Sequence, residues 1–221
     1  MIHKIHYVTS NRGKVREAKR LASIDAPFIK IIDKNTELEE IQTFDEKTVI
    51  VHKARQAWNL VQGPLLVDDA GFYIKKYGFY PGTLAKPTAI SLGWEGIYRL
   101  IEDDNRVSIY CRICYTHDGE TLHHFRADTE GEIITPPSLE LLNARGFASI
   151  FRPTGSRFTY LQMAGKPEAN NFYHRTKALK LFYEWYIKNL PQAPLPSILA
   201  GMSESDLQGP EMHASEHQEE E

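Results

Sequence analysis

Thr9-Ser-Asn-Arg-Gly-Lys-Val-Arg-Glu17 is a polar segment with one glycine, placed between an apolar run and a run of helical spacing. The apolar run closes with Tyr7 and Val8 and is typical of a short strand, whereas Val15 begins an amphipathic pattern of helical period. Asn11 is a favourable N-cap for that helix. A strand that leads into a helix N-terminus presents unpaired backbone N–H groups and the positive end of the helix dipole. The segment therefore predicts a phosphate site, to which Lys14 adds a full positive charge.

This motif is short, and when it is taken alone a capped surface helix with a solvated Lys14 is the more common explanation. The glycine-rich phosphate loop that ends in Gly-Lys-Ser/Thr is missing from the sequence, which disfavours an ordinary P-loop ATPase.

Strand and helix patterns alternate through the first half of the chain, and a long hairpin follows. Strands are expected at 28–32, 65–67, 72–77, 106–115 and 121–134, and helices at about 45–61, 89–101 and 171–187. Polar or turn-forming segments are expected at 38–43, 68–71, 81–82 and around Asp118-Gly119. The order predicts an α/β fold, with a mixed sheet, flanking helices and two lobes.

Composition and charge restrict the class of protein. The 221 residues are 42% hydrophobic and 11% aromatic, enough for one compact domain over residues 1–189. Residues 190–221 are rich in Pro, Ser, Glu and Gln and are expected to form a disordered acidic tail. The last 33 residues contain seven acidic and no basic side chains, so residues 1–188 carry 26 basic against 22 acidic ones. That slight basic excess suits a phosphate-bearing small molecule and argues against a nucleic-acid binder.

Cys111 and Cys114 lie three apart in a strand-like run, which directs them to opposite faces of a sheet and disfavours a zinc or redox pair. No signal peptide or long apolar span is recognisable, so a soluble, cytoplasmic protein that does not enter membranes is expected.

Carboxylates follow the apolar run at 65–67. Asp68 and Asp69, together with Glu40 from the polar loop, are candidate ligands for Mg²⁺, which binds a few carboxylates, waters and substrate phosphates. A turn capped by Asp is the alternative for Asp68-Asp69-Ala70-Gly71. Lys53 and Lys86 lie near the ends of predicted elements and could add positive charge, as phosphoryl chemistry requires. Solvated surface lysines are the alternative for both.

Several segments resemble, in order, the inosine triphosphate pyrophosphatase family. They are Thr9-Ser10-Asn11-x-x-Lys14-x-x-Glu17, Glu40-Ile41-Gln42, Lys53-Ala54, Asp68-Asp69-Ala70-Gly71, Pro81-Gly82, Gly131-x-Ile133 and His174-Arg175. The resemblance covers roughly residues 5–188. It implies a mixed α/β fold with a central groove, usually a homodimer, and Mg²⁺-dependent hydrolysis of non-standard purine nucleoside triphosphates to a monophosphate and pyrophosphate.

The resemblance also implies roles for individual residues. Glu40 and Asp69 would bind the metal, and Asp69 would activate water with Asp68 beside it as the second catalytic carboxylate. Contacts to the triphosphate would come from the following residues: Thr9, Ser10, Asn11, Lys14, Lys53, Ala70 and Lys86. Phe147, His174 and Arg175 would contact the base.

The chain departs from the family pattern at the nucleobase end. Residues 146–153 (GFASIFRP) replace the usual Gly-Phe-Gly-Tyr/Trp-Asp-Pro-x-Phe and lack its base-contacting aspartate. Ala169 stands where a lysine is expected, and Tyr173 replaces the serine of Ser-His-Arg. These changes predict weaker discrimination between bases. A pyrophosphatase for a different or modified base and a non-catalytic nucleotide-binding module both stay open.

Overall fold

The computed structural model describes residues 2–78, 80–101, 103–135 and 138–189. Residues 1–187 form one unit, and the predicted acidic tail at 190–221 lies outside the described residues. The boundary at residue 189 therefore stays a prediction.

Within the described residues, seven strands form one mixed sheet in the order β2-β1-β3-β5-β6-β7, with β4 paired to β3. β1 runs parallel to β2 and β3, and the remaining pairs are antiparallel. The strands are β1 (His3–Val8), β2 (Ile29–Lys34), β3 (Leu65–Ile74), β4 (Pro81–Gly82), β5 (Arg106–Thr116), β6 (His123–Ile133) and β7 (Phe151–Pro153). The predicted mixed α/β sheet is confirmed.

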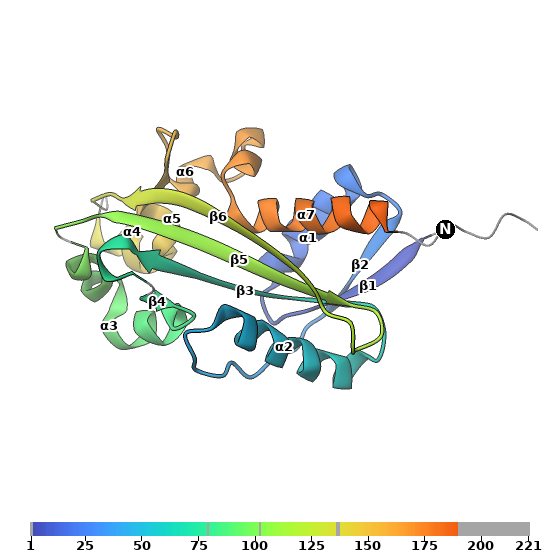
Figure 1. Cartoon of the computed structure of the whole chain (residues 1–221). Coiled ribbons are helices and arrows are strands. Elements are labelled where there is room, and N and C mark those ends of the chain that lie inside the picture. The colour runs from blue at the N-terminus through green and yellow to red at the C-terminus, as the bar shows by residue number, and fades with distance from the viewer. Residues whose placement is uncertain (1, 79, 102, 136–137, 190–221) are drawn as a thin grey trace, which may run out of the picture. The chain divides into compact units, whose positions relative to one another are not determined.

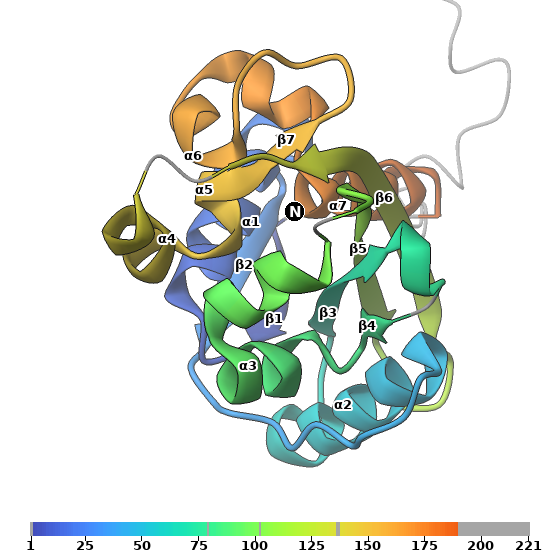
Figure 2. The same cartoon turned by 90° about the vertical axis from the view of Figure 1, so that its left-hand side faces the viewer.

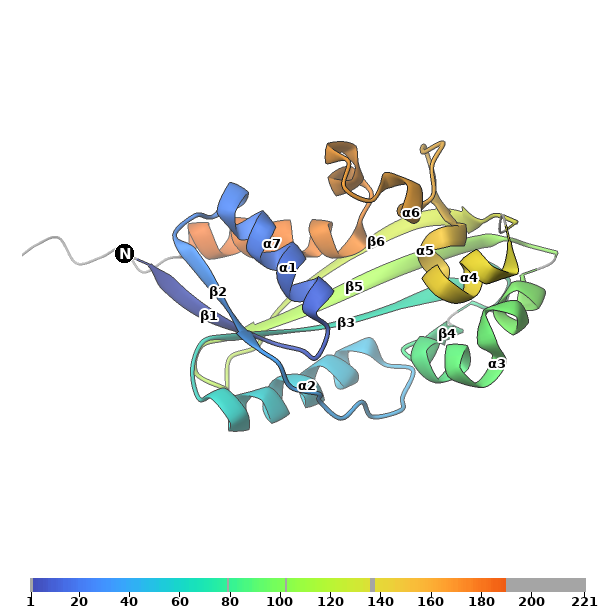
Figure 3. The same cartoon turned by 180° about the vertical axis from the view of Figure 1, so that it is seen from behind.

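Helices cover both faces of the sheet. They are α1 (Arg12–Asp25), α2 (Glu46–Val61), α3 (Ala85–Leu100), α4 (Leu139–Arg145), α5 (Phe147–Ile150), α6 (Tyr160–Met163) and α7 (His174–Lys188), with 3₁₀ turns at Lys75–Tyr77 and Pro167–Asn171. Figures 1 and 3 show α1 and α7 on one face and α2 on the other. Figure 2 looks onto the end of the sheet where α3 and α4–α6 gather.

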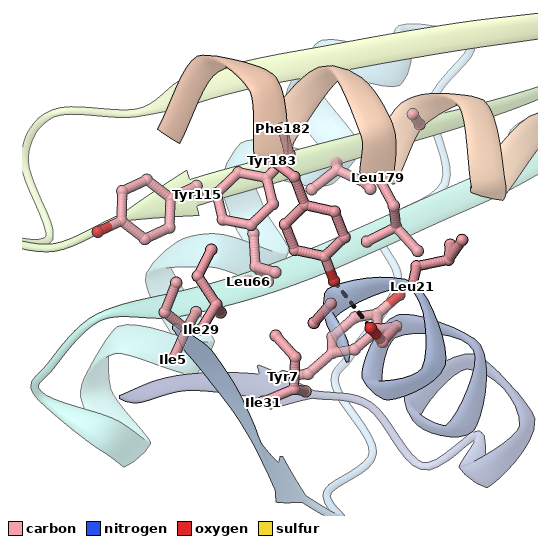
Figure 4. Close-up of a cluster of buried hydrophobic side chains, with 14 of the residues drawn as sticks. Ile5, Tyr7, Leu21, Ile29, Ile31, Leu66, Tyr115, Leu179, Phe182 and Tyr183 are labelled. Atoms are coloured by element: carbon pink, nitrogen blue, oxygen red, sulfur yellow. Dashed lines mark hydrogen bonds between the residues drawn. The ribbon is translucent and has the colours of Figure 1, made fainter. Parts of the chain in front are cut away.

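Buried side chains form separate clusters at the two ends of β3. Leu66 packs with α1 and α7 in one cluster (Figure 4), where the Tyr183 hydroxyl donates to the Ala18 carbonyl oxygen over 2.9 Å. Leu65 and Val67 pack against α2 in a second cluster. Phe72 and Ile74 belong to a third, which includes residues of α3–α6. The apolar side chains of β3 are thus interrupted by two buried charged residues, Asp68 and Asp69.

The predicted break in β3 was wrong. Residues 65–74 form one strand, and Asp68 and Asp69 pair with Ile113 and Arg112 in a continuous ladder with β5. On the opposite edge, within the described residues, the ladder to β1 ends at Leu66 and the ladder to β4 begins at Phe72. The two aspartates therefore lie beside an open stretch of sheet edge rather than at the end of a strand.

Smaller differences concern element limits. Residues 75–77 form a 3₁₀ turn instead of continuing the strand, and Pro81–Gly82 pairs with β3 as a two-residue strand rather than forming only a turn. α3 begins at Ala85 and α7 at His174. The short elements α4–α6 and β7 were not predicted, because each has too few residues to show a period.

The two cysteines lie on opposite faces of β5, as expected. Cys111 packs in the cluster with α1 and α7, and Cys114 in the cluster with α2; both are buried free thiols. Among the described residues, no group of three or more His, Cys, Asp or Glu side chains is placed to hold a metal ion. Nor does any helix in this part of the chain have the length and apolar character to cross a membrane.

Candidate active site

The segment at 9–17 has the predicted helix-cap geometry. The side-chain oxygen of Asn11 accepts hydrogen bonds from the backbone N–H groups of Gly13 (2.9 Å) and Lys14 (3.3 Å). The Thr9 hydroxyl oxygen accepts from the Asn11 N–H over 3.2 Å, which orders the approach to the helix. β1 therefore delivers an ordered, solvent-facing loop to the N-terminus of α1, where an anion is favoured.

Lys14 reaches from this helix to Asp68. Its ammonium lies 3.0 Å and 2.9 Å from the two carboxylate oxygens of Asp68, and Arg175 Nε donates to one of them over 3.1 Å. Arg175 also lies 3.3 Å from Glu17, which accepts a hydrogen bond from Thr176 over 2.7 Å. A cluster of alternating charges, partly exposed around the buried Asp68, thus joins α1, β3 and α7.

The pKa of Asp68 shows how these charges balance. Burial alone would raise the pKa of its carboxyl, but Lys14 and Arg175 outweigh that effect and hold the pKa well below its ordinary value. Asp68 is 4% exposed, so it is a buried anion that stays ionised because it is paired.

Asp69 lies on the other face of β3, because successive strand residues point in opposite directions. One of its oxygens accepts from Lys53 over 2.8 Å and the other from the Tyr110 hydroxyl over 3.1 Å. Lys53 Nζ also lies 2.7 Å from Glu40. The structure consequently brings Asp69, Glu40 and Lys53 together but separates Asp69 from Asp68, contrary to the expected carboxylate pair.

A polar cavity of about 230 Å³ lies beside the open edge of β3. Its lining includes most of the residues predicted to bind triphosphate and metal: Thr9, Ser10, Asn11, Lys14, Glu40, Lys53, Asp68 and Lys86. Lys86 is the most exposed of its lysines and approaches Glu40 at 3.9 Å. This cavity combines a helix N-terminus with ammonium groups, which is the chemistry that binds a polyphosphate.

A second cavity of about 580 Å³ follows along β3, and Lys86 lines both cavities. Its wall is largely apolar and aromatic and includes Phe72, Trp94 and Phe147. The Phe147 ring lies 4.7 Å from that of Phe72, so its orientation is fixed by packing. Ala70, predicted among the triphosphate contacts, lines this cavity instead.

The two predicted residues at the start of α7 lie in different environments. His174 lines the apolar cavity, with its Nδ1 atom 3.3 Å from the Tyr160 hydroxyl. Burial, reinforced by the nearby positive charge of Arg175, lowers the pKa of His174 far below its ordinary value, so its ring is neutral near pH 7. Arg175 is directed elsewhere, into the cluster with Asp68 and Glu17.

Glu40 and Asp69 fit the predicted Mg²⁺ site in the chemistry of their donor groups. They come from different segments, yet both contact the single ammonium group of Lys53, so their oxygens converge on one cationic position. Mg²⁺ commonly uses one or two carboxylates and completes its shell with water and substrate phosphates. Glu40 lines the polar cavity, and Asp69 lies behind Lys53, which also lines it, so the two carboxylates meet that requirement at the edge of the cavity.

Sequence reasoning missed the polar network behind Asp69. The Tyr110 ring stacks on Tyr73 with centroids 5.3 Å apart, and the Arg126 guanidinium lies 5.4 Å from the Tyr110 centroid. Glu46 binds Arg126 over 2.7 Å and Arg112 over 3.1 Å, and also accepts from the Tyr73 hydroxyl. Burial tends to raise the pKa of Glu46, but these partners hold it below its ordinary value. The available signal was the alternation of polar residues in β5 and β6, which gains meaning only once the strand register is known.

Comparison with known proteins bears on the family and the fold. The chain is 34% identical over 192 residues to the dITP/XTP pyrophosphatase of Pyrococcus horikoshii, covering 85% of this chain and 98% of that protein. It is 32% identical over 192 residues to the inosine triphosphate pyrophosphatase of Neurospora crassa, covering 85% and 95%. The solved structure of a Ham1 protein from Coxiella burnetii shares the fold, with a TM-score of 0.69 and 22% identity over 85% of this chain and 100% of that one.

The predicted family resemblance is therefore confirmed. Residues 5–185 match the Ham1 family, and the chain belongs to that family.

Proposed function

We propose that this protein hydrolyses a nucleoside triphosphate between the α and β phosphates, releasing a nucleoside monophosphate and pyrophosphate, and so removes non-standard purine nucleotides from the pool. Its relatives are named as dITP/XTP and inosine triphosphate pyrophosphatases. The observation that carries the proposal is the pair of adjoining cavities, one polar and one aromatic, with Lys86 in the lining of both. One nucleotide would place its phosphates in the first cavity and its base in the second.

The polar cavity, together with Asp69 beside Lys53, supplies the groups that this reaction needs. Lys14, Lys53 and the N-terminus of α1 would bind the phosphates and stabilise the negative charge that develops on them. Asp69 would accept a proton from the attacking water, with its carboxylate oriented by Lys53 and Tyr110. Mg²⁺ held by Glu40 and Asp69 would supply Lewis-acid activation of the phosphates and water.

The aromatic cavity supports recognition of a base by stacking, with few directed hydrogen bonds. Phe147 and Trp94 offer ring faces, and His174 offers a neutral imidazole. A wall with so few polar groups leaves few hydrogen-bonding groups without a partner when the wrong base enters, so discrimination between bases should be weak. The scarcity of polar groups in this cavity is also compatible with a substrate that carries a modified base. The Mg²⁺ requirement, a homodimer and a cytoplasmic location belong to the proposal as expectations from the family resemblance.

A triphosphate panel tests the proposal. Purified protein with Mg²⁺ is supplied separately with ITP, XTP, dITP, GTP, ATP and base-modified triphosphates, and pyrophosphate and orthophosphate are quantified. We expect pyrophosphate with at least one substrate, and we expect Asp69→Asn to lower kcat by about 100- to 10,000-fold. Glu39→Gln is the control, because this exposed carboxylate lies next to Glu40 in the chain. Binding of triphosphate without turnover across the whole panel would instead indicate a non-catalytic binding module.

A further inference from the structure

Lys53 bridges the two carboxylates that are predicted to hold the metal. Its ammonium lies 2.7 Å from Glu40 and 2.8 Å from Asp69. The lysine is 5% exposed and projects from α2, whereas Glu40 lies in the loop before that helix and Asp69 in β3. Three separate segments therefore meet at one buried ammonium group.

This arrangement solves an electrostatic problem within the protein. Asp69 is buried and Glu40 is partly exposed, and two carboxylates that converge in this way repel each other unless a cation lies between them. Glu40 and Asp69 each accept a hydrogen bond from the Lys53 ammonium group, which lies between them. Lys53 thus keeps the site charged and assembled without any metal.

The same contacts put the ammonium group in competition with a metal. A cation bound by both Glu40 and Asp69 would need oxygens that Lys53 now engages. Lys53 also lines the polar cavity, so phosphate oxygens bound there would offer its ammonium group alternative partners. A triphosphate would then draw the lysine from the carboxylates as it brings its own metal ion.

We propose that Lys53 is a resident cation that occupies the metal position of the nucleotide-free protein, so that a divalent cation enters together with the triphosphate rather than before it. The proposal deepens the proposed function and rests on it for the identity of the substrate. Its central claim, competition between the Lys53 ammonium and a divalent cation, concerns binding alone and requires no turnover.

Titration of the nucleotide-free protein with Mn²⁺, followed by the electron paramagnetic resonance signal of the free ion, tests this claim. Lys53→Met keeps an unbranched side chain of similar length but removes the ammonium group, and it should tighten Mn²⁺ binding by about tenfold or more, because a unit charge in direct contact with both carboxylates is lost. Lys86→Met is the matched control. This variant removes the same charge from the same cavity. Lys86 is exposed, however, and its ammonium group comes no nearer to Glu40 than 3.9 Å, so Lys86→Met should tighten Mn²⁺ binding by less than about threefold. Equal or weaker Mn²⁺ binding by Lys53→Met, or an equal gain in both variants, would overturn the proposal.

Loss of Lys53 leaves the buried Asp69 and the partly exposed Glu40 without their cation, so the stability of the variant must be measured as well. Mn²⁺ should raise the melting temperature of Lys53→Met more than that of the wild type, since the metal replaces the missing charge. If Lys53→Met does not fold, Lys53→Gln serves as the neutral variant, and Lys53→Arg retains the cation and should leave Mn²⁺ binding weak. Pyrophosphate release by the wild type is scored separately. A wild type without activity whose Lys53 variant binds Mn²⁺ tightly would refute the function and support the competition.

Discussion

Replacing Asp68 with asparagine should destabilise the protein severely, although the side chain barely changes in size. Asp68 holds Lys14 at 2.9 Å and Arg175 at 3.1 Å, and its side chain is 1% exposed. The amide of Asp68→Asn carries no charge, so the two cations would lose the anion between them. Removing one partner of a buried ion pair typically costs about 3–5 kcal/mol. That is a large part of the roughly 5–15 kcal/mol by which most domains are stable.

The loss of stability caused by Asp68→Asn should become smaller as the pH falls. The pKa of Asp68 in the folded protein is held well below its ordinary value: burial opposes this, but Lys14 and Arg175 dominate. A carboxyl with a depressed folded-state pKa contributes its full stabilisation above its unfolded pKa, which is about 3.9. The contribution is lost as the pH falls further, towards the folded-state pKa. The difference between wild type and Asp68→Asn should therefore be full at neutral pH and shrink below about pH 4.

Urea unfolding followed by tryptophan fluorescence at pH 7 and at pH 3 measures both effects. Glu95→Gln is the control. The ion pair between Glu95 and Arg99 is exposed, so it should contribute no more than about 0.5 kcal/mol to the free energy of unfolding. A decrease of less than about 1 kcal/mol in the free energy of unfolding of Asp68→Asn at pH 7, or a difference from wild type that widens on acidification, would refute a stabilising role for the Asp68 charge.

Two further substitutions probe the surroundings of Asp69. A Cβ atom at Gly71 would lie 2.2 Å from the Gly82 carbonyl oxygen and 2.8 Å from the Tyr110 ring, so Gly71→Ala should lower stability by about 1–3 kcal/mol. An unchanged melting temperature by circular dichroism would contradict that packing argument. Tyr110→Phe removes the hydroxyl that donates to Asp69 and should lower kcat by about 10- to 100-fold with little change in KM. Steady-state kinetics on the best triphosphate of the panel test this prediction. A kcat within twofold of the wild-type value would show that the Tyr110 hydroxyl does not contribute to catalysis.

Features set by neighbouring residues could be predicted from the sequence. Asn11 caps α1 through backbone groups two and three residues away, so the cap and the anion-binding helix start were visible locally. The β5–β6 hairpin was equally visible, because two alternating runs flank Asp118-Gly119. These elements lie close to where their patterns predict them.

Features set by distant pairing were not visible. Asp68-Asp69-Ala70-Gly71 has the composition of a turn, since Asp and Gly are favoured there. In the fold, these residues continue a strand because β5 supplies the ladder and Lys14 and Lys53, from two different helices, neutralise the two carboxylates. Local propensity was overridden by tertiary contacts that begin tens of residues away.

His174 and Arg175 show why the nucleobase end could not be resolved from its motif. Adjacent helical residues point about 100° apart, so only one of the two can enter a given cavity, and the sequence does not say which. The fold places His174 in the aromatic cavity and turns Arg175 onto Asp68, which also holds Lys14. One buried carboxylate thereby connects the helix that carries His174 with Lys14 of the loop proposed to bind phosphate. A substitution at Arg175 should consequently alter the hold on the phosphates as well as the selection of the base.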